Sequence, residues 1–181
     1  MQTYSINKSM LVQPNHQALH QRADIDPFTD KNVDWAERQK EMLQLMHDKF
    51  GLGLAAPQLG ASYRMFVMTH STLGDIGVYN PEIISRSEET ACREEGCLTF
   101  PLLFFMVTRP ASCVVKFQDQ FQKEHEMELT GTDAQCFQHE YDHLEGLLFL
   151  EYASDMKLQR AIAKREKTVK KLLRMQKNGN S

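Results

Sequence analysis

Long apolar runs are missing from this chain of 181 residues. Although 41% of the residues are apolar, no run approaches the ~20 that a membrane-spanning helix needs. The first fourteen residues have neither the apolar segment of a secretory signal nor the arginine content of a transit peptide. These absences predict a soluble protein of the cytoplasm.

Cysteine is also scarce, since the chain has only four. That number is low for a disulfide scaffold of this length and predicts free thiols in a reducing compartment. Repeats and low-complexity linkers are missing as well, so the sequence predicts one domain with its own core.

Acidic side chains are rare only at the C-terminal end of the chain. Residues 154–181 hold nine basic and two acidic side chains, a net charge of +7, while the rest of the chain carries −10. Such asymmetry predicts a basic tail that meets an anionic partner.

Helix signals appear at three places. Asp34 is placed to cap a helix over 35–50, with Trp35, Met42, Met46 and Phe50 on one apolar stripe. A second helix is expected over 133–146. A third is expected from a Ser154 cap to about residue 176, with an apolar stripe of Leu158, Ile162, Val169 and Leu173.

Short β-type runs lie between the first two helices, at 63–69, 77–79, 114–117 and 126–129. A loop is expected over 51–60, and a further strand after Cys97. The sequence therefore predicts an α+β fold, with short and mostly antiparallel strands around the helix of residues 133–146.

That helix carries the motif Gln138-His-Glu-Tyr-Asp-His-Leu144. A spacing of four puts His139 and His143 on one helix face, where both imidazoles can bind the same metal ion. Glu140 lies beside them, within reach of a proton on water.

The third metal ligand has three candidates. The extended zinc-peptidase pattern needs histidine at position 149, where this chain has Phe149. Glu166 belongs to a segment that looks solvated. Cys97, in the run Glu95-Gly-Cys-Leu-Thr99, would give a thiolate and two imidazoles with one position open.

The chain resembles peptide deformylases in three motifs. The family patterns GxGxAAxQ, EGCLS and QHExDHLxG stand here at residues 51–58, 95–99 and 138–146, within a resemblance that covers roughly residues 18–172. The resemblance implies a catalytic domain over 1–153, whose first 17 residues are an extension, followed by a basic helix and tail over 154–181.

The family removes the formyl group from the N-terminal formyl-methionine of new polypeptides. The resemblance implies that Cys97, His139 and His143 hold a divalent ion, physiologically Fe²⁺, which Zn²⁺, Ni²⁺ or Co²⁺ can replace. Glu140 is then the general acid and base, while the Gln58 amide and the Leu98 N–H stabilise the oxyanion.

The substrate contacts implied by the resemblance come from three segments, and they are Gly51, Leu52, Gly53, Gly96, Thr132, Gln135 and Cys136. Two departures from the family pattern stand out. Thr99 replaces a serine, and Thr132, Asp133 and Gln135 stand where the family is more apolar, near the pocket for methionine. Glu95 is expected to hold its loop through a salt bridge to Arg109.

The resemblance also implies partners. Nascent formyl-methionyl peptides are the expected substrate, and the basic helix is expected to contact ribosomal RNA through residues such as Lys170 and Lys171. Neither a membrane nor DNA is expected as a partner. Two other readings stay open from the residues: a short zinc endopeptidase with Glu166 as ligand, and a nucleic-acid-binding module with a closed zinc site that includes Cys92.

Overall fold

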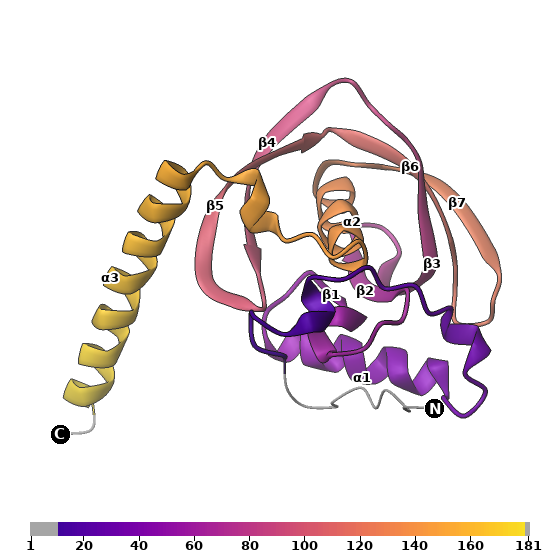
Figure 1. Ribbon diagram of the computed structural model, residues 1–181, viewed down its shortest axis with the longest axis horizontal. Helices are drawn as coiled ribbons and strands as arrows, with labels where there is room; N and C mark the ends of the chain where they lie inside the picture. Colours follow the sequence, from indigo (N-terminus) through magenta and orange to yellow (C-terminus); the bar gives the residue numbers. More distant parts are fainter. Residues whose placement is uncertain (1–10, 180–181) are drawn as a thin grey trace.

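Two antiparallel sheets surround a central helix. The computed structural model describes residues 11–179, with side chains as far as Gln176. Residues 1–10 of the expected N-terminal extension and residues 180–181 of the tail lie outside the described residues. Helix α2 (Gly131–Leu144) lies in the middle, and helix α1 (Trp35–Asp48) lies below it in the view of Figure 1.

The larger sheet has the strand order β1-β2-β3-β6-β7 and the smaller sheet is the hairpin β4-β5. Every named pair is antiparallel, as predicted. The strands are β1 (Gly53–Ala55), β2 (Met65–His70), β3 (Gly74–Arg86), β4 (Thr90–Cys97), β5 (Phe100–Pro110), β6 (Ser112–Gln118) and β7 (Glu124–Thr130).

Helix α1 begins as predicted, because the Asp34 carboxylate accepts a hydrogen bond from the Glu37 N–H at 3.0 Å. Its end differs from the prediction. Phe50 lies beyond the helix with φ at 57°, and its side chain is 97% exposed, so its place on the buried stripe was wrong. The left-handed turn at Phe50 carries the chain away from the core and into the segment that enters the site.

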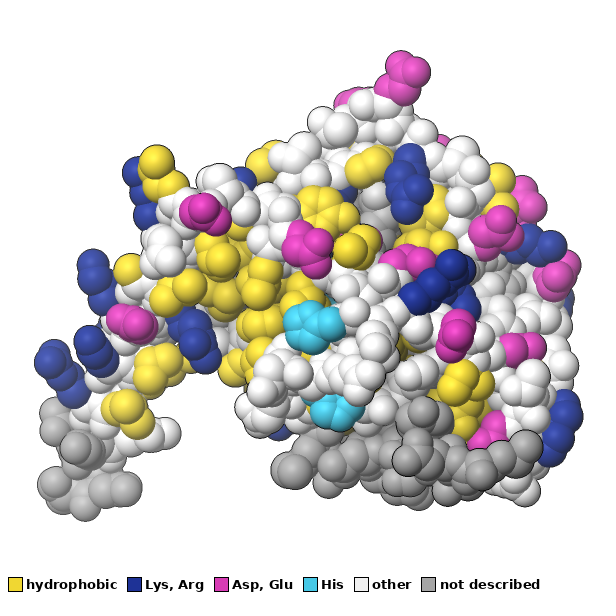
Figure 2. Space-filling view, in the orientation of Figure 1, with side chains coloured by type: hydrophobic (Ala, Val, Ile, Leu, Met, Phe, Trp, Pro, Cys, Tyr) yellow, Lys and Arg dark blue, Asp and Glu magenta, His cyan; other side chains and the backbone are white. Residues whose placement is uncertain are grey.

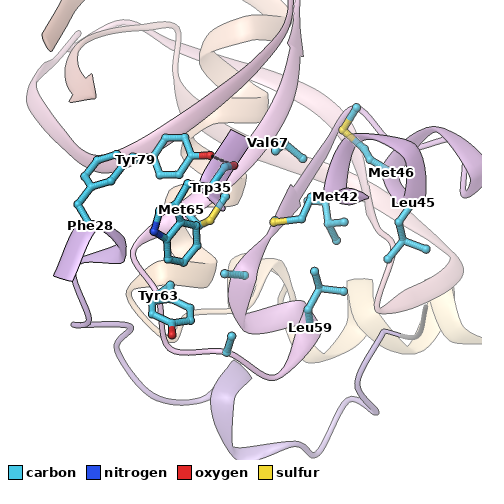
Figure 3. Close-up of a cluster of buried hydrophobic side chains, with 13 residues drawn as sticks. Phe28, Trp35, Met42, Leu45, Met46, Leu59, Tyr63, Met65, Val67 and Tyr79 are labelled. Carbon is cyan, nitrogen blue, oxygen red and sulfur yellow. Dashed lines mark hydrogen bonds between the residues drawn. The ribbon is translucent and has the colours of Figure 1, made fainter. Parts of the chain in front are cut away.

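The other stripe residues of α1 are buried in a cluster against β2 and β3 (Figure 3). Trp35 meets the Tyr63 ring edge-on at 4.9 Å, and the Tyr79 hydroxyl donates to the Trp35 carbonyl at 2.9 Å. Each side chain of this size contributes about 1.5–3 kcal/mol when buried. The packing anchors α1 and so fixes the start of the segment that follows it.

The predicted loop over 51–60 is wrong in part. It contains strand β1, which pairs with β2 from Gly53 to Ala55, and a 3-10 turn over Ala56–Leu59. Strand β3 is far longer than the predicted 77–79, and β4 was not predicted at all. Strand β5 is the strand expected after Cys97.

Helix α3 (Asp155–Gly179) begins at the predicted Ser154 cap, whose hydroxyl accepts from the Lys157 N–H at 3.4 Å. Near its start, Leu158 and Ile162 pack against the cluster around β5. Farther along it projects from the domain (Figure 1), and Leu173 is 53% exposed. None of the described helices combines the length and apolar character needed to cross a bilayer.

Candidate metal centre and substrate cavity

Three buried side chains bring metal-binding atoms together. His139 and His143 lie one turn apart on α2, and Cys97 ends β4. Their ligand atoms all lie within 4.8 Å of one another, and the Cys97 Sγ is 3.3 Å from the His143 Nε2. Tetrahedral zinc bonds of about 2.3 Å to sulfur and 2.1 Å to nitrogen place the donors about 3.6 Å apart. The donor set therefore fits one metal ion.

Strand β4 turns two of its side chains toward α2. Alternate residues of a strand share a face, and both Glu95 and Cys97 are buried while Glu94 is exposed. The Glu95 carboxylate accepts from the His139 Nδ1 at 3.0 Å. This contact leaves the His139 Nε2 for the metal and fixes the orientation of the ring.

Glu95 is held in turn by Arg109, as predicted, through two hydrogen bonds of 2.6 and 3.0 Å. The guanidinium also donates to Asp142 at 2.7 Å, and the Tyr152 hydroxyl donates to the same Asp142 oxygen. Burial opposes ionisation of Glu95, but His139 and Arg109 outweigh it and lower its pKa to about 2. Removing Arg109 would take the guanidinium away from two buried carboxylates, a loss of about 3–5 kcal/mol.

The two histidines have opposite pKa shifts. Burial favours neutral His139, but hydrogen bonds with Cys97 and Glu95 outweigh it and raise its pKa to about 10. Burial and the neighbouring His139 charge lower the pKa of His143 well below its usual value. Because a metal binds neutral imidazole, loading the site with metal releases the His139 proton.

Glu140 follows His139 on α2 and is 4% exposed. Burial raises its pKa to about 7, against the charge of His139, which lowers it. Its Oε2 makes no hydrogen bond with the residues that the structure describes. A carboxyl with a pKa near neutrality and a free oxygen is suited to both accept and return a proton.

The Gln58 side chain comes from the 3-10 turn after β1. Its Oε1 accepts from the Ala55 N–H at 2.8 Å, which directs its Nε2 toward the Cys97 Sγ at 3.4 Å and the Thr99 hydroxyl at 3.2 Å. Thr99 thus supplies the hydroxyl that a serine would supply. The amide N–H groups face the metal donors.

A cavity of about 580 Å³ opens in front of these groups. Twelve of the thirteen predicted site residues line it: Gly51, Leu52, Gly53, Gln58, Gly96, Cys97, Leu98, Thr132, Gln135, Cys136, His139 and Glu140. The other one, His143, lies deeper, with 1% of its surface exposed. The structure thus brings residues from the three motifs to one place.

Gly53, the glycine of β1, lies against the Glu140 side chain. A Cβ on Gly53 would lie 2.6 Å from both the Cγ and the Cδ of Glu140. Any larger residue would therefore displace Glu140, so a residue without a Cβ is required here for the site to form.

Sequence reasoning missed the rim of the cavity. Besides Glu95, the additional lining residues are Lys49, Phe50, Glu94, Pro101, Leu102 and Phe104. The apolar run after Phe100 was the available signal, because such a run on an exposed strand face indicates a contact surface. Phe50 could not be recognised as a cavity residue, because its spacing placed it on the apolar stripe of the first helix.

Asp133 does not line the cavity, contrary to what its position suggested. Its carboxylate accepts from the Ser71 N–H at 3.0 Å and from the Ser71 hydroxyl. It thereby joins the first turn of α2 to the turn between β2 and β3. Thr132 and Gln135 do line the cavity and give it the expected polar wall.

The other candidate ligands lie elsewhere. Glu166 is exposed on α3, and Cys92 is exposed on β4. Phe149 is buried and stacks on Phe105 at 4.7 Å, beside the His139 ring. Among the described residues, Cys97, His139 and His143 are the one group placed to share a metal. Neither the endopeptidase nor the closed zinc site is supported.

A three-residue metal site with a buried carboxyl and an amide donor in one cavity is the arrangement of a metal-dependent hydrolase. The polypeptide deformylase family model matches residues 8–159, and the chain belongs to that family. The predicted resemblance, the hydrolase class and the α+β fold are confirmed.

Individual relatives agree. A peptide deformylase of Rhizobium meliloti is 39% identical over 148 residues, which cover 80% of this chain and 85% of the relative. A peptide deformylase structure from Legionella pneumophila superposes with a TM-score of 0.79 at 32% identity, covering 92% and 98% of the two chains. One from Synechococcus elongatus in complex with actinonin has a TM-score of 0.78 at 29% identity, covering 86% and 85%.

Proposed function

We propose that this hydrolase removes the formyl group from the N-terminal formyl-methionine of newly made polypeptides and releases formate. The observation that carries the proposal is the single cavity onto which the metal donors, the Gln58 amide and the Glu140 carboxyl all open. Family membership supports the same reaction. Hydrolysis of an amide needs an activated water, a stabilised oxyanion and a proton for the leaving amine.

Cys97, His139 and His143 would hold one divalent ion, and the family resemblance implies Fe²⁺, which Zn²⁺, Ni²⁺ or Co²⁺ can replace. Such an ion lowers the pKa of water and polarises the formyl oxygen. The thiolate and the hydrogen bond from His139 to Glu95 fix the positions of the donors.

Glu140 takes the proton of the attacking water and later gives it to the departing amine. Its pKa of about 7 makes both transfers feasible near neutral pH. The Gln58 amide donates to the formyl oxygen as negative charge develops there, and the Leu98 N–H is the second donor. The bond from the Ala55 N–H keeps the Gln58 amide oriented for this contact.

The peptide itself would enter between two free strand edges. Within the described chain, β1 and β4 each pair with one strand only, and Gly53 of β1 and Gly96 of β4 both line the cavity. An extended substrate can therefore pair with backbone on both sides. Gly51 and Leu52 lie at the entrance on the β1 side, and Thr132, Gln135 and Cys136 would face the methionine side chain.

The experiment measures metal binding and formate release separately. Glu140→Gln keeps the three ligands and is expected to bind one equivalent of metal without releasing formate from formyl-Met-Ala-Ser. Cys97→Ala is expected to lose both metal binding and formate release. A Glu140→Gln protein that released formate at the wild-type rate would contradict the proposal.

We further propose that residues 154–181 act as a separate unit and bind ribosomal RNA in the cytoplasm. Basic side chains gather along α3 (Figure 2), and the proposed contacting set is Lys164, Arg165, Lys167, Lys170, Lys171 and Arg174. Binding of this kind weakens steeply as salt rises. A chain that ends at Ala163 lacks all six of these side chains and is expected to sediment free of ribosomes, and equal binding by this shortened chain would refute the idea.

A further inference from the structure

A second cavity, of about 440 Å³, lies where the root of α3 meets the outer face of the β4-β5 hairpin. In Figure 2 apolar side chains gather between the root of α3 and the main body. None of the metal donors lines this cavity, and neither does Gln58 or Glu140.

The cavity combines an apolar floor with positive charge. Its exposed apolar side chains are Phe104 (48% exposed), Met106 (44%) and Met156 (65%). Of the described residues that line it, Lys157, Arg160 and Lys164 carry positive charge and Glu94 carries negative charge. An extended chain with apolar and acidic side chains matches this surface.

The second cavity adjoins the first, because Glu94 and Phe104 line both. The path between them follows β4. This strand runs back from Cys97 at the metal donors, past Gly96, to Glu94, and within the described chain one of its edges is free. A peptide that leaves the metal donors along β4 and passes Glu94 comes to the rim that the two cavities share.

We propose that the second cavity binds the downstream part of the same polypeptide whose formyl group is removed. At about 3.3 Å per residue, the three steps from Cys97 to Glu94 span about 10 Å, so the segment from roughly the fourth residue onward reaches it. Apolar side chains of that segment lie over Phe104 and Met106, and acidic ones face Arg160 and Lys164. This inference rests on the proposed function, since it extends the substrate of the same site.

The test compares kcat/KM for three formylated peptides. One is formyl-Met-Ala-Ser, and two are about ten residues long, with distal halves of alternating Leu and Glu or of Ser and Gly. The Leu/Glu peptide is expected to gain roughly fivefold over the short peptide, mainly through KM, as a few exposed contacts allow. The gain falls as salt rises. The Ser/Gly peptide is expected to gain little.

Variants test whether the gain in kcat/KM comes from contacts in this cavity. Arg160→Glu and, as a second variant, Met156→Ser are expected to reduce the gain and leave cleavage of the short peptide unchanged. Lys171→Glu makes the same charge change on α3 outside the cavity, so it should keep the gain. Equal kcat/KM for long and short peptides, or a gain that survives Arg160→Glu, would overturn the inference. A chain that cleaves no formylated peptide at all would instead overturn the proposed function.

Discussion

Both polar atoms of the Gln58 side-chain amide make hydrogen bonds. The Oε1 accepts from the Ala55 N–H, and the Nε2 donates toward Cys97 and Thr99. Replacing Gln58 with leucine removes the donor proposed to meet the formyl oxygen but keeps the side-chain volume similar. We expect kcat to fall by about 10²–10³ with a smaller change in KM.

Metal content provides the control for this change, because Gln58 is not a ligand and bound metal should stay at the wild-type level. Thr99→Ser keeps the hydroxyl that Gln58 contacts and should stay near wild-type activity. If Gln58→Leu retained full kcat, the amide would have no part in stabilising the oxyanion.

Gly53 gives a second prediction at the scale of single residues. An alanine here places its Cβ against buried Glu140, so we expect at least a hundredfold loss of kcat/KM and, by overpacking, about 1–3 kcal/mol of stability. Gly51→Ala meets only the flexible Leu98 side chain and should be milder. Formate release and urea unfolding of both variants measure the difference, and equal effects would argue against the contact with Glu140.

The sequence predicted residues that come together at the cavity and the pairing of Glu95 with Arg109, but not the other contacts that hold them. Regular spacing on α2 and the three motifs were sufficient for Cys97 and His139. The link between Glu95 and His139 could not be predicted, because it joins side chains 44 residues apart through a buried polar contact. Only the packing of β4 on α2 decides such a pairing.

Among the elements, the first turn of α2 has two functions. Asp133 attaches it to the β2–β3 turn, whereas Thr132 and Gln135 face the cavity. Asp133→Ala leaves the Ser71 groups without their partner, so we expect a stability loss of about 1–3 kcal/mol with little change in KM. Thr132→Val should instead change KM and leave the stability nearly unchanged. Urea midpoints and KM values distinguish the two, and a large KM effect from Asp133→Ala would contradict this assignment.

The starts of α1 and α3 were predictable because local capping groups set them. Asp34 and Ser154 cap α1 and α3 as expected. The β4-β5 hairpin was largely missed because its two faces do not alternate in character. Exposed Leu102, Phe104 and Met106 make β5 a continuous apolar run, which has no period of two.

At the scale of the whole molecule, the cavity depends on the separation of the two sheets. Strand β1 at the edge of the larger sheet and β4 in the hairpin leave a gap above α2, and their contributions come from distant parts of the chain. Motifs specify the groups that line such a gap. Its width and its extension toward α3 depend on tertiary packing, so they could not be read from the sequence.

The most direct measurement of the central claim is formate release from formyl-Met-Ala-Ser by the full chain, loaded with ferrous ion without oxygen. Mass spectrometry of the same samples reports whether any peptide bond is cut. We predict one formate for each peptide consumed, with every peptide bond intact, and no release by Glu140→Gln. The absence of formate with ferrous, nickel and cobalt ions alike, or cleavage inside the peptide, would contradict the account.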